Sequence, residues 1–379
     1  MKEEVKEITV FTIGDSSKIS TWSNIPYFFT ETLIMKSIKV NRVDLSPSPL
    51  VIKIFRGTAL PVLRMIYKNT TYNYLRTFTH FVNVRYRVKK AVKKFPYADI
   101  NLFLTFSFSS IGLTQKPTVL LCDWTYEYFL MHFKNKKPDF LEKLSINREN
   151  RQIENADLVV LLFNSMKSHM NLRYINPKIS YLGNYVINSL YVASERDMLN
   201  KKNSYSILFV GNKYYKEGAK SLIDALKIIK NDYPNAKLNI VGMDASNFKK
   251  LPEYVKCYGF LDKGNPAERE IFHQLFKTAR VFVNTNPKWG AFSTTIEAMY
   301  SYIPIVVSPY DEFVSTFGKN INFGCYCNKN GPDKIAEKIR IIFDSPNYHA
   351  LCVNAHNAVK DFTWSSYIDK FLMQIKSLE

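Results

Sequence analysis

Short apolar runs alternate with segments of helical periodicity along the whole chain. Each run has the length of a buried strand, and the segments between the runs place apolar side chains at helical spacing. Strands and helices that alternate in this way form parallel sheets with right-handed crossovers. The pattern therefore predicts an α/β protein. The predicted strands, with their turns, are 8–13, 100–106, 118–122, 158–162, 178–184, 207–210, 236–241, 255–260, 281–283 and 305–307.

The strand pattern restarts in the middle of the chain. Ile8–Ile13 opens the first half, and Ile207–Val210 opens the second. At 379 residues, the chain suits two domains better than one. Asn200–Ser204 is the best candidate for the linker, because it is short, polar and carries two lysines. The predicted division is 1–190, 191–364 and a C-terminal helix with one apolar face over 365–379.

The stretch from Val281 to Asp311 has the chemistry of a ligand site. A buried strand leads into a polar loop, and Ser293 or Thr294 is a plausible N-cap for the helix that carries Glu297. Open α/β sheets bind ligands in loops at the carboxyl ends of their strands, and the amides that begin a helix favour an anion. A nucleotide diphosphate fits this arrangement.

Two further loops follow predicted strands in the first half. Gly14 opens a loop containing STWSNIP, which leads into a helix. The loop lacks the GxGxxG pattern, so a nicotinamide cofactor is not supported, and a plain structural turn is the alternative to a binding loop. Asp123 follows the strand 118–122, where a carboxylate can either bind hydroxyl groups of a ligand or orient a helix.

The charge of the chain is strongly positive and concentrated. Lys and Arg number 52 against 33 Asp and Glu, which gives a net charge of +19. Much of the excess falls in Lys53–Lys94, where apolar and aromatic residues are interleaved. This composition is typical of basic amphipathic helices on an anionic membrane surface. A general surface bias is the alternative. Nucleic acid is a weaker third interpretation, because no zinc-finger or RNA-binding signature accompanies the charge.

The cysteines and the apolar pattern predict the compartment. Five cysteines are odd in number and lack CxxC spacing, as expected of a reduced, cytosolic protein. The start, MKEEVKEITVFTIG, is charged and then apolar for one strand only, unlike a signal peptide. No window approaches the ~20 apolar residues of a transmembrane helix. If the protein works at a membrane, we expect it on the cytosolic face.

Several motifs together resemble one family. IEAMYSYIPIVVS is similar to a signature of the retaining group 1 glycosyltransferases, and ILFVGNKYYKEGAKSLIDAL is similar to their donor-phosphate turn and helix. The family loop tWSGtP resembles TWSNIP, with Asn24 in place of the glycine, and the family pair D.T resembles Asp123 and Thr125. ENRQIENADLVVLLFN and KISYLGN are similar to two further family segments. The resemblance runs from Val10 to the last helix.

The resemblance implies the GT-B fold, an α/β architecture of two facing Rossmann-like domains. In the family, a helix corresponding to 365–379 crosses back to the N-terminal domain. The C-terminal domain would bind a nucleotide-diphosphate sugar and the N-terminal domain an acceptor. Transfer would proceed with retention, with no cofactor and no essential metal. The loop of Gly14, Trp22, Ser23 and Asn24 would lie on the acceptor side.

Residue by residue, the likeness to the family's donor site is incomplete. Glu297 falls on the glutamate that hydrogen-bonds the ribose, whereas Trp289 falls on the glutamate that contacts the hexose. Trp289 can stack on a sugar but cannot accept its hydroxyl protons. The other donor-loop candidates are Gly290, which falls on the family glycine, Phe292, Ser293 and Thr294.

The phosphate side of the resemblance is altered as well. After Gly211, Asn212 stands where the family has arginine, and Glu217 stands where it has lysine. A carboxylate repels a diphosphate, so we expect Glu217 to point elsewhere. Lys213 or Lys216 would then supply the charge.

These points lead to one expected function and one alternative. We expect a retaining hexosyltransferase, cytoplasmic and peripheral on the inner face of the cell membrane, with Asp123 and Lys216 as candidate catalytic residues. It would move a sugar from a nucleotide-diphosphate donor to a lipid-linked or saccharide acceptor in surface polysaccharide, lipopolysaccharide or glycolipid synthesis. The alternative is a catalytically weak relative that binds a sugar nucleotide or a partner protein, since Trp289 and Glu217 replace residues that the family uses. No nucleic-acid partner is expected.

Overall fold

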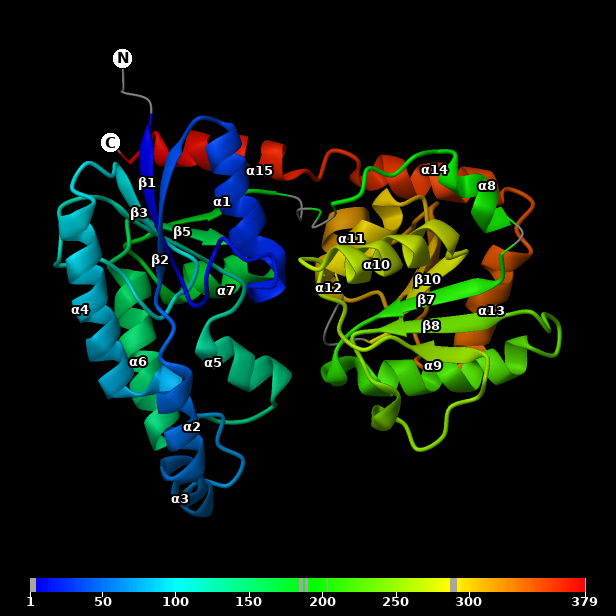
Figure 1. Ribbon diagram of the computed structural model, residues 1–379, viewed down its shortest axis with the longest axis horizontal. Helices are drawn as coiled ribbons and strands as arrows, with labels where there is room; N and C mark the ends of the chain where they lie inside the picture. The colour runs from blue at the N-terminus through cyan, green and yellow to red at the C-terminus, as the bar shows by residue number, and fades with distance from the viewer. Residues whose placement is uncertain (1–4, 184–186, 188–189, 203, 287–291, 379) are drawn as a thin grey trace. The chain divides into compact units, whose positions relative to one another are not determined.

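Two parallel sheets organise the chain in the computed structural model, which describes residues 5–183, 187, 190–202, 204–286 and 292–378. Residue contacts separate two units, Met1–Gly183 with Tyr367–Glu379 (unit 1) and Asn184–Ser366 (unit 2). Among the described residues, each unit holds one six-stranded sheet with helices on both faces (Figure 1). The α/β fold class that the sequence predicts is confirmed.

The sheet of unit 1 is buried along most of its length. The inner strands β3 and β5 are buried at every position, because helices cover both faces, and they therefore appear in the sequence as continuous apolar runs. The strands pair in the parallel order β2-β1-β3-β4-β5-β6. Their bounds are β1 (Glu7–Thr12), β2 (Lys39–Asp44), β3 (Ile100–Phe103), β4 (Thr118–Cys122), β5 (Leu158–Leu161) and β6 (Lys178–Tyr181).

The helices of unit 1 include one from the far end of the chain. The bounds of the others are α1 (Ile25–Met35), α2 (Pro49–Gly57), α3 (Ala59–Ile66), α4 (Phe78–Lys94), α5 (Tyr126–Tyr128), α6 (Phe140–Glu154) and α7 (Ser165–Arg173). The C-terminal helix α15 (Trp364–Ile375) packs on α1, where the rings of Phe371 and Phe29 meet edge to face at 5.1 Å. The ammonium of Lys36 also pairs with Asp369 at 2.7 Å. The predicted return of this helix to the first half of the chain is confirmed.

The sheet of unit 2 has the parallel order β12-β11-β10-β7-β8-β9. Its strands are β7 (Ser206–Val210), β8 (Lys237–Val241), β9 (Val255–Cys257), β10 (Val281–Asn284), β11 (Ile305–Val307) and β12 (Gly324–Tyr326). Its helices are α8 (Asp197–Lys202), α9 (Lys216–Ile229), α10 (Pro266–Thr278), α11 (Phe292–Tyr300), α12 (Asp311–Phe317), α13 (Pro332–Phe343) and α14 (Tyr348–Val359). Of the helices described in either unit, none has both the length and the apolar character needed to cross a bilayer.

Both strand orders contain a point where the chain changes direction across the sheet. In unit 1, β1 lies between β2 and β3, and in unit 2, β7 lies between β8 and β10. Ligands of open α/β sheets bind outside the carboxyl ends of the strands at such a switch point. The fold therefore places the loops after β1 and β3 at one candidate site and the loops after β7 and β10 at another.

The predicted linker turned out to be wrong. Asn200–Ser204 begins inside α8, and the side chain of Lys201 is fully buried. Its ammonium donates to the carbonyl oxygens of Phe276 at 2.8 Å and Ser301 at 2.7 Å, and burial lowers the pKa of Lys201 to about 8. A lysine next to another lysine resembles a solvated linker in the sequence, but this one holds α8 against the core of unit 2.

A buried histidine gives unit 1 a predictable sensitivity to acid. His80 on α4 is 1% exposed, and its Nε2 has no hydrogen-bond partner among the described residues. Burial, with the nearby charge of Arg87, lowers the pKa of His80 to about 4. The unfolded chain therefore binds this proton more readily than the folded chain between pH 6.5 and 4. We expect the free energy of unfolding to fall by about 3 kcal/mol across that window.

Urea denaturation at a series of pH values measures this effect. The variant His80→Leu, which keeps an apolar side chain but cannot titrate, should show a flatter profile between pH 6.5 and 4. A profile as steep as that of the unsubstituted protein would contradict the assignment of this acid sensitivity to His80.

Candidate functional site

The carboxyl ends of β7 and β8 come together through glycines in unit 2. The N–H of Gly211, the residue after β7, donates to the carbonyl oxygen of Val241 at 2.9 Å. Gly242 has φ +92°, and a Cβ there would lie 2.7 Å from the Gly211 carbonyl oxygen. A Cβ on Gly211 would lie 2.9 Å from the side chain of Tyr215. Only glycine allows these two turns to pack this closely, which leaves a backbone surface at the switch point.

Helix α9 begins at this edge. Its buried Gly218 lies against Asn286, which follows β10, so the first turn of α9 and the loop after β10 are neighbours. The Asn284 amide joins the ends of β10 and β7 by donating to the Val210 carbonyl oxygen at 3.5 Å. A helix of this length carries partial positive charge and unpaired N–H groups at its first turn. The edge is therefore suited to an anion.

The charged residues around the start of α9 differ in whether they already have a partner. The carboxylate of Glu217 is exposed and pairs with Lys220 at 2.7 Å, so its charge is compensated on the helix surface. Lys213 is exposed, and its ammonium lies 5.8 Å from the ring centre of Tyr214. Lys216 is half-buried at the first position of α9 and has no ion pair among the described residues. Both lysines follow Gly211, and Lys216 is the one that lies in the first turn of α9.

Asn212 has a structural task in the same turn. Its side-chain oxygen accepts from the N–H of Tyr214 at 3.0 Å and caps the short 3₁₀ turn Lys213–Tyr215. An asparagine at the N-cap of a turn is favourable because its oxygen replaces a missing backbone acceptor. Asn212 therefore shapes the loop where the resembling family has an arginine.

Among the described residues of unit 2, the most buried charge pair joins Glu297 to Lys263. Glu297 on α11 is 3% exposed, and its two oxygens accept from the Lys263 ammonium at 2.7 and 3.0 Å. The same ammonium lies 4.2 Å from the ring centre of Phe272. Burial raises the pKa of Glu297, and the positive charge of Lys263 opposes that rise. Sequence reasoning missed Lys263, because a lysine in the polar turn after β9 gives no signal of a partner 34 residues later.

The other predicted donor residues have different positions. The Phe292 side chain is buried and packs edge to face against Phe313 at 5.7 Å, so its ring belongs to the core. Ser293 and Thr294 are half-buried in the first turn of α11. Trp289 and Gly290 lie outside the described residues.

One buried hydroxyl at this edge was not predicted. Tyr310 follows β11, and its hydroxyl group has no hydrogen-bond partner among the described residues. Leaving a buried hydroxyl unpaired is unfavourable, and such a group in a native protein calls for an explanation. A ligand oxygen at this edge would supply the missing partner.

The loop after β1 in unit 1 is strained. Gly14 has φ +112°, and its N–H donates to Asp44 at 3.0 Å. Trp22, Ser23 and Asn24 follow with φ values of 34°, 54° and 70°, all in the left-handed region. Consecutive non-glycine residues there are unusual and occur chiefly where function requires them, and asparagine tolerates the region best. Asn24, which stands where the resembling family has glycine, thus adopts a left-handed conformation.

Asp123 lies at the carboxyl end of β4 and supports its own turn. Its Oδ1 accepts from the Trp124 N–H at 2.8 Å and from the Cys122 thiol at 3.2 Å. Burial raises the pKa of Asp123, although these hydrogen bonds oppose the rise. Thr125 then caps α5 by accepting from the N–H of Tyr128 at 3.1 Å.

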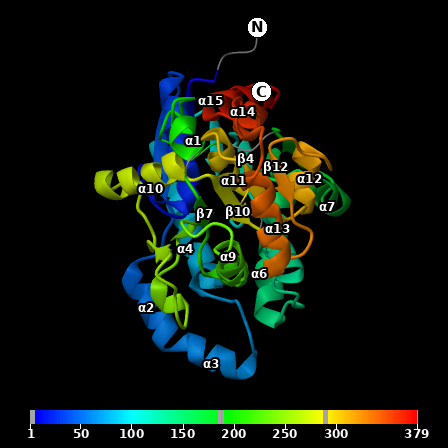
Figure 2. The ribbon, with the colours of Figure 1, turned by 90° about the vertical axis from the view of Figure 1, so that its right-hand side faces the viewer.

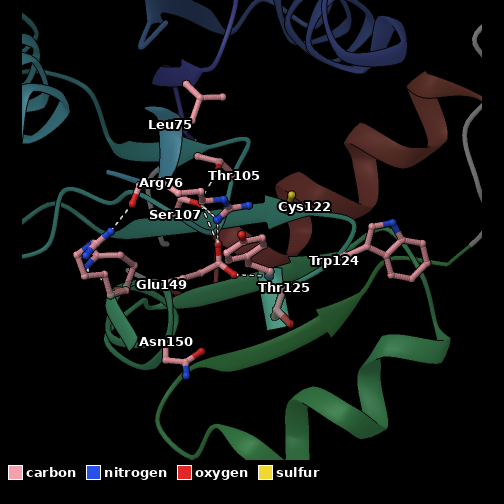
Figure 3. Close-up of polar contacts among 12 residues, drawn as sticks. Leu75, Arg76, Thr105, Ser107, Cys122, Trp124, Thr125, Glu149 and Asn150 are labelled. Carbon is pink, nitrogen blue, oxygen red and sulfur yellow. Dashed lines mark hydrogen bonds and ion pairs between the residues drawn. The ribbon is translucent and has the colours of Figure 1, made fainter. Parts of the chain in front are cut away.

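Glu149 holds the start of α5 through hydrogen bonds (Figure 3). It is 3% exposed and accepts from the Tyr126 N–H at 2.5 Å, from Arg76 at 2.8 Å and from the Ser107 hydroxyl at 2.8 Å. The cavity beside it measures about 10 Å³, room for about one water molecule, and is lined by Arg76, Ser107, Arg148 and Glu149 among others. The cavity is too small for a substrate, and the cluster around Glu149 holds the start of α5.

Comparison with known protein families gives one match. Residues 193–358 match the family model described as glycosyl transferases group 1. The matched segment contains the α9 turn, the Lys263–Glu297 pair and Tyr310. No curated protein sequence matches the chain.

Several solved structures are similar to this chain over nearly its full length. Sucrose-phosphate synthase from Thermosynechococcus elongatus is 14% identical, with a TM-score of 0.68 over 99% of this chain and 100% of that chain. HepE from Anabaena, in complex with UDP and glucose, is 16% identical, with a TM-score of 0.63 over 98% and 100%. A glycosyltransferase from Rickettsia africae is 14% identical, with a TM-score of 0.62 over 99% of both chains. At these identities the likeness establishes the fold, two Rossmann-like units of the GT-B type.

Proposed function

We propose that this chain is a glycosyltransferase that takes its sugar from a nucleoside-diphosphate donor bound to unit 2, because residues 193–358 match the model of glycosyl transferases group 1 and the chain has the GT-B fold. The observation that carries the proposal is the chemistry gathered at the carboxyl edge of the unit 2 sheet. The first turn of α9 with Lys216 offers positive charge, and Glu297 offers carboxylate oxygens. A nucleoside diphosphate needs both kinds of group.

The donor would be held at its two ends. Its diphosphate would lie against the N–H groups of the α9 turn and the Lys216 ammonium, where an anion is favoured. The ribose hydroxyls would donate to the carboxylate of Glu297. Each carboxylate oxygen has two lone pairs, so Glu297 can keep its bonds to Lys263 and still accept from a hydroxyl. The unpaired hydroxyl of Tyr310 would gain a partner on the same ligand.

The proposed transfer has a defined balance of bonds. The bond from the anomeric carbon to the diphosphate breaks with its electron pair on the diphosphate, where Lys216 stabilises the new charge. A bond forms from that carbon to an acceptor oxygen on the same face of the sugar, which is transfer with retention. Asp123 would take the acceptor's hydroxyl proton, and the burial that raises the pKa of Asp123 makes it a better base.

We propose an acceptor that is a saccharide or a lipid-linked saccharide, as in the synthesis of surface polysaccharide, lipopolysaccharide or glycolipid. The strained loop of Trp22, Ser23 and Asn24 would contact this acceptor, together with Asp123. A lipid-linked acceptor would place the protein on the cytoplasmic face of the cell membrane. The donor sugar in this proposal is a hexose, and no metal or other cofactor is required.

Binding of nucleotides tests the donor site directly. Thermal shift and calorimetry with UDP, GDP, ADP, CMP and their common sugar conjugates should identify one nucleotide class that binds. At about 100 times its Kd, that ligand should raise the melting temperature by about 5 °C or more. Lys216→Ala should weaken binding tenfold or more, because it removes a charge-assisted hydrogen bond to phosphate.

Lys227→Ala is the matched control, since Lys227 is an exposed lysine of the same helix that pairs with Asp224. Its donor affinity should equal that of the unsubstituted protein. If Lys216→Ala and Lys227→Ala bind the donor equally well, the assignment of Lys216 to the diphosphate is wrong.

A catalytically weak relative, which binds a sugar nucleotide or a partner protein, is the second candidate. It is favoured by Glu217, whose charge is already paired with Lys220, and by Lys263, which is committed to Glu297. Absence of any nucleotide-dependent shift would move the partner-binding form of this candidate ahead. Turnover of a bound donor with any acceptor would reject the candidate.

A further inference from the structure

We propose that α2 and α3 form a docking surface for an anionic lipid bilayer. The surface is defined by residues 49–68, which follow β2 at the carboxyl edge of the unit 1 sheet. Figure 1 and Figure 2 both show the two helices beyond that edge, at the end of unit 1 farthest from its N-terminus. The docking surface does not depend on the proposed function. Only its consequence for the acceptor, given below, rests on that function.

The surface exposes aliphatic side chains that a lone domain would bury. Neither α2 nor α3 contains a buried residue. Positions 62, 65 and 66 share one face of α3, and positions 50, 51 and 54 share one face of α2. A single exposed apolar residue is ordinary, but a continuous group on successive helices marks an interaction site. The exposed fractions are 64% for Leu50, 36% for Val51, 54% for Ile54, 49% for Val62, 75% for Met65 and 65% for Ile66.

The helices are fixed to unit 1 by the chain that follows them. The N–H of Thr71 donates to Glu142 on α6 at 2.7 Å, and the Thr71 hydroxyl donates to the same carboxylate at 2.9 Å. The ring of Phe55 on α2 meets Tyr74 edge to face at 5.8 Å. The exposed aliphatic faces are therefore held in a defined position.

The charge of this region selects an anionic partner. The 54 residues from Leu45 to Ala98 contain eleven Lys and Arg residues and no Asp or Glu. Basic side chains on the helices and just after them are exposed, and they alternate with the aliphatic side chains. The hydrocarbon parts of these lysines and arginines can therefore lie along the edge of the acyl region while their charged groups reach the lipid headgroups. The four on this surface are Lys53, Arg56, Arg64 and Lys68.

The other possible occupants fit less well. A second copy of the chain would bring two surfaces of the same positive sign together, with no acidic residue in either to compensate. Single-stranded nucleic acid is bound by aromatic rings that stack on bases, whereas the exposed apolar residues of α2 and α3 are aliphatic. Aliphatic residues with neighbouring lysines and arginines match the interface of a bilayer.

Docking in this orientation would bring the acceptor edge of unit 1 to the lipid. β2 ends on the same edge of the sheet as β1 and β4, which carry the Gly14 loop and Asp123. If the proposed function holds, an acceptor carried on a lipid would therefore reach Asp123 without leaving the bilayer surface.

Vesicle flotation with the full chain tests the surface. We expect the protein to float with vesicles of phosphatidylcholine and phosphatidylglycerol, and not with vesicles of phosphatidylcholine alone. The triple variant Ile54→Ser, Met65→Ser, Ile66→Ser should bind the anionic vesicles about tenfold more weakly or worse. The double variant Lys53→Glu, Arg56→Glu should lose binding as well. These residues are exposed, so the melting temperatures should not change.

The control variant is Leu172→Ser, Ile175→Ser, which removes two aliphatic residues of unit 1 that are 90% and 91% exposed and lie outside the surface. It should float like the unsubstituted protein. Equal flotation of the triple variant and the control would overturn the proposal, as would equal binding to phosphatidylcholine alone. Self-association in the ultracentrifuge that the triple variant abolishes, without vesicle binding, would overturn it in favour of a second copy. Nucleotide shifts measured on the unsubstituted protein separate the two hypotheses, since vesicle binding without any nucleotide binding would refute the proposed function and leave the docking surface standing.

Discussion

Replacing Glu297 by alanine is expected to lower the free energy of unfolding of unit 2 by about 3 kcal/mol, and replacing its partner as well should restore most of the loss. The single substitution leaves the nearly buried ammonium of Lys263 without its counter-charge. An uncompensated buried charge is strongly destabilising, whereas an apolar pair of similar volume is often as stable as the ion pair. Urea denaturation of Glu297→Ala and of the double variant Glu297→Leu, Lys263→Met measures both effects.

The double variant also separates stability from ligand binding. It should melt close to the unsubstituted protein and yet bind the donor nucleotide at least tenfold more weakly, because the acceptor for the ribose hydroxyls is gone. If the double variant is stable and binds the donor normally, Glu297 is only a structural residue and its proposed role in the site fails.

Replacing Glu142 by glutamine should destabilise unit 1 by about 3 kcal/mol. The carboxylate is fully buried at the N-terminus of α6 and accepts from the ammonium of Lys136 at 2.7 and 2.6 Å, from the Asp139 N–H at 2.9 Å and from Thr71. Burial alone would raise the pKa of Glu142, but Lys136 and the other donors lower it to about 2. A lowered pKa stabilises the fold above pH 4.5, and this contribution is lost as the pH falls through 2. In urea denaturation, the free energy of unfolding of Glu142→Gln should not show this loss between pH 4.5 and 2.

Glu337→Gln is the control for this prediction. Glu337 lies on α13 with a side chain that is 44% exposed, and its partners Lys334 and Lys338 also lower its pKa to about 2. Solvent and salt screen such a pair, so the substitution should leave stability nearly unchanged. Equal losses for Glu142→Gln and Glu337→Gln would show that burial is not what gives Glu142 its effect.

Much of the fold could be predicted because it depends on local patterns. β5 is a continuous apolar run and β10 is apolar up to its last residue, Asn284, since both faces of each sheet are covered. Strand ends were less accurate: the predicted strand 100–106 ends at Phe103 as β3, and 255–260 ends at Cys257 as β9. After β3 the residues 104–106 stay buried in a turn, and after β9 Phe260 is 73% exposed, so an apolar residue alone does not separate strand from turn.

The polar interior could not be predicted, because it depends on contacts between distant segments. Lys263 meets Glu297 across 34 residues, and Thr71 meets Glu142 across 71. Lys201 donates to carbonyl oxygens 75 and 100 residues away. In the sequence each of these residues is a charge at the edge of a helix or turn, indistinguishable from a solvated one.

The packing of α15 on α1 determines when unit 1 can be completed during synthesis. Phe29 and Phe371 are both fully buried, and each depends on the other for part of its cover. A ribosome finishes β1 to β6 and then all of unit 2 before Phe371 emerges. Unit 2 can therefore fold while unit 1 still exposes the apolar side of α1 that α15 will later cover. Unit 1 is therefore synthesised first but completed last. Until α15 has packed on α1, unit 1 is the part of the chain that a chaperone would have to protect.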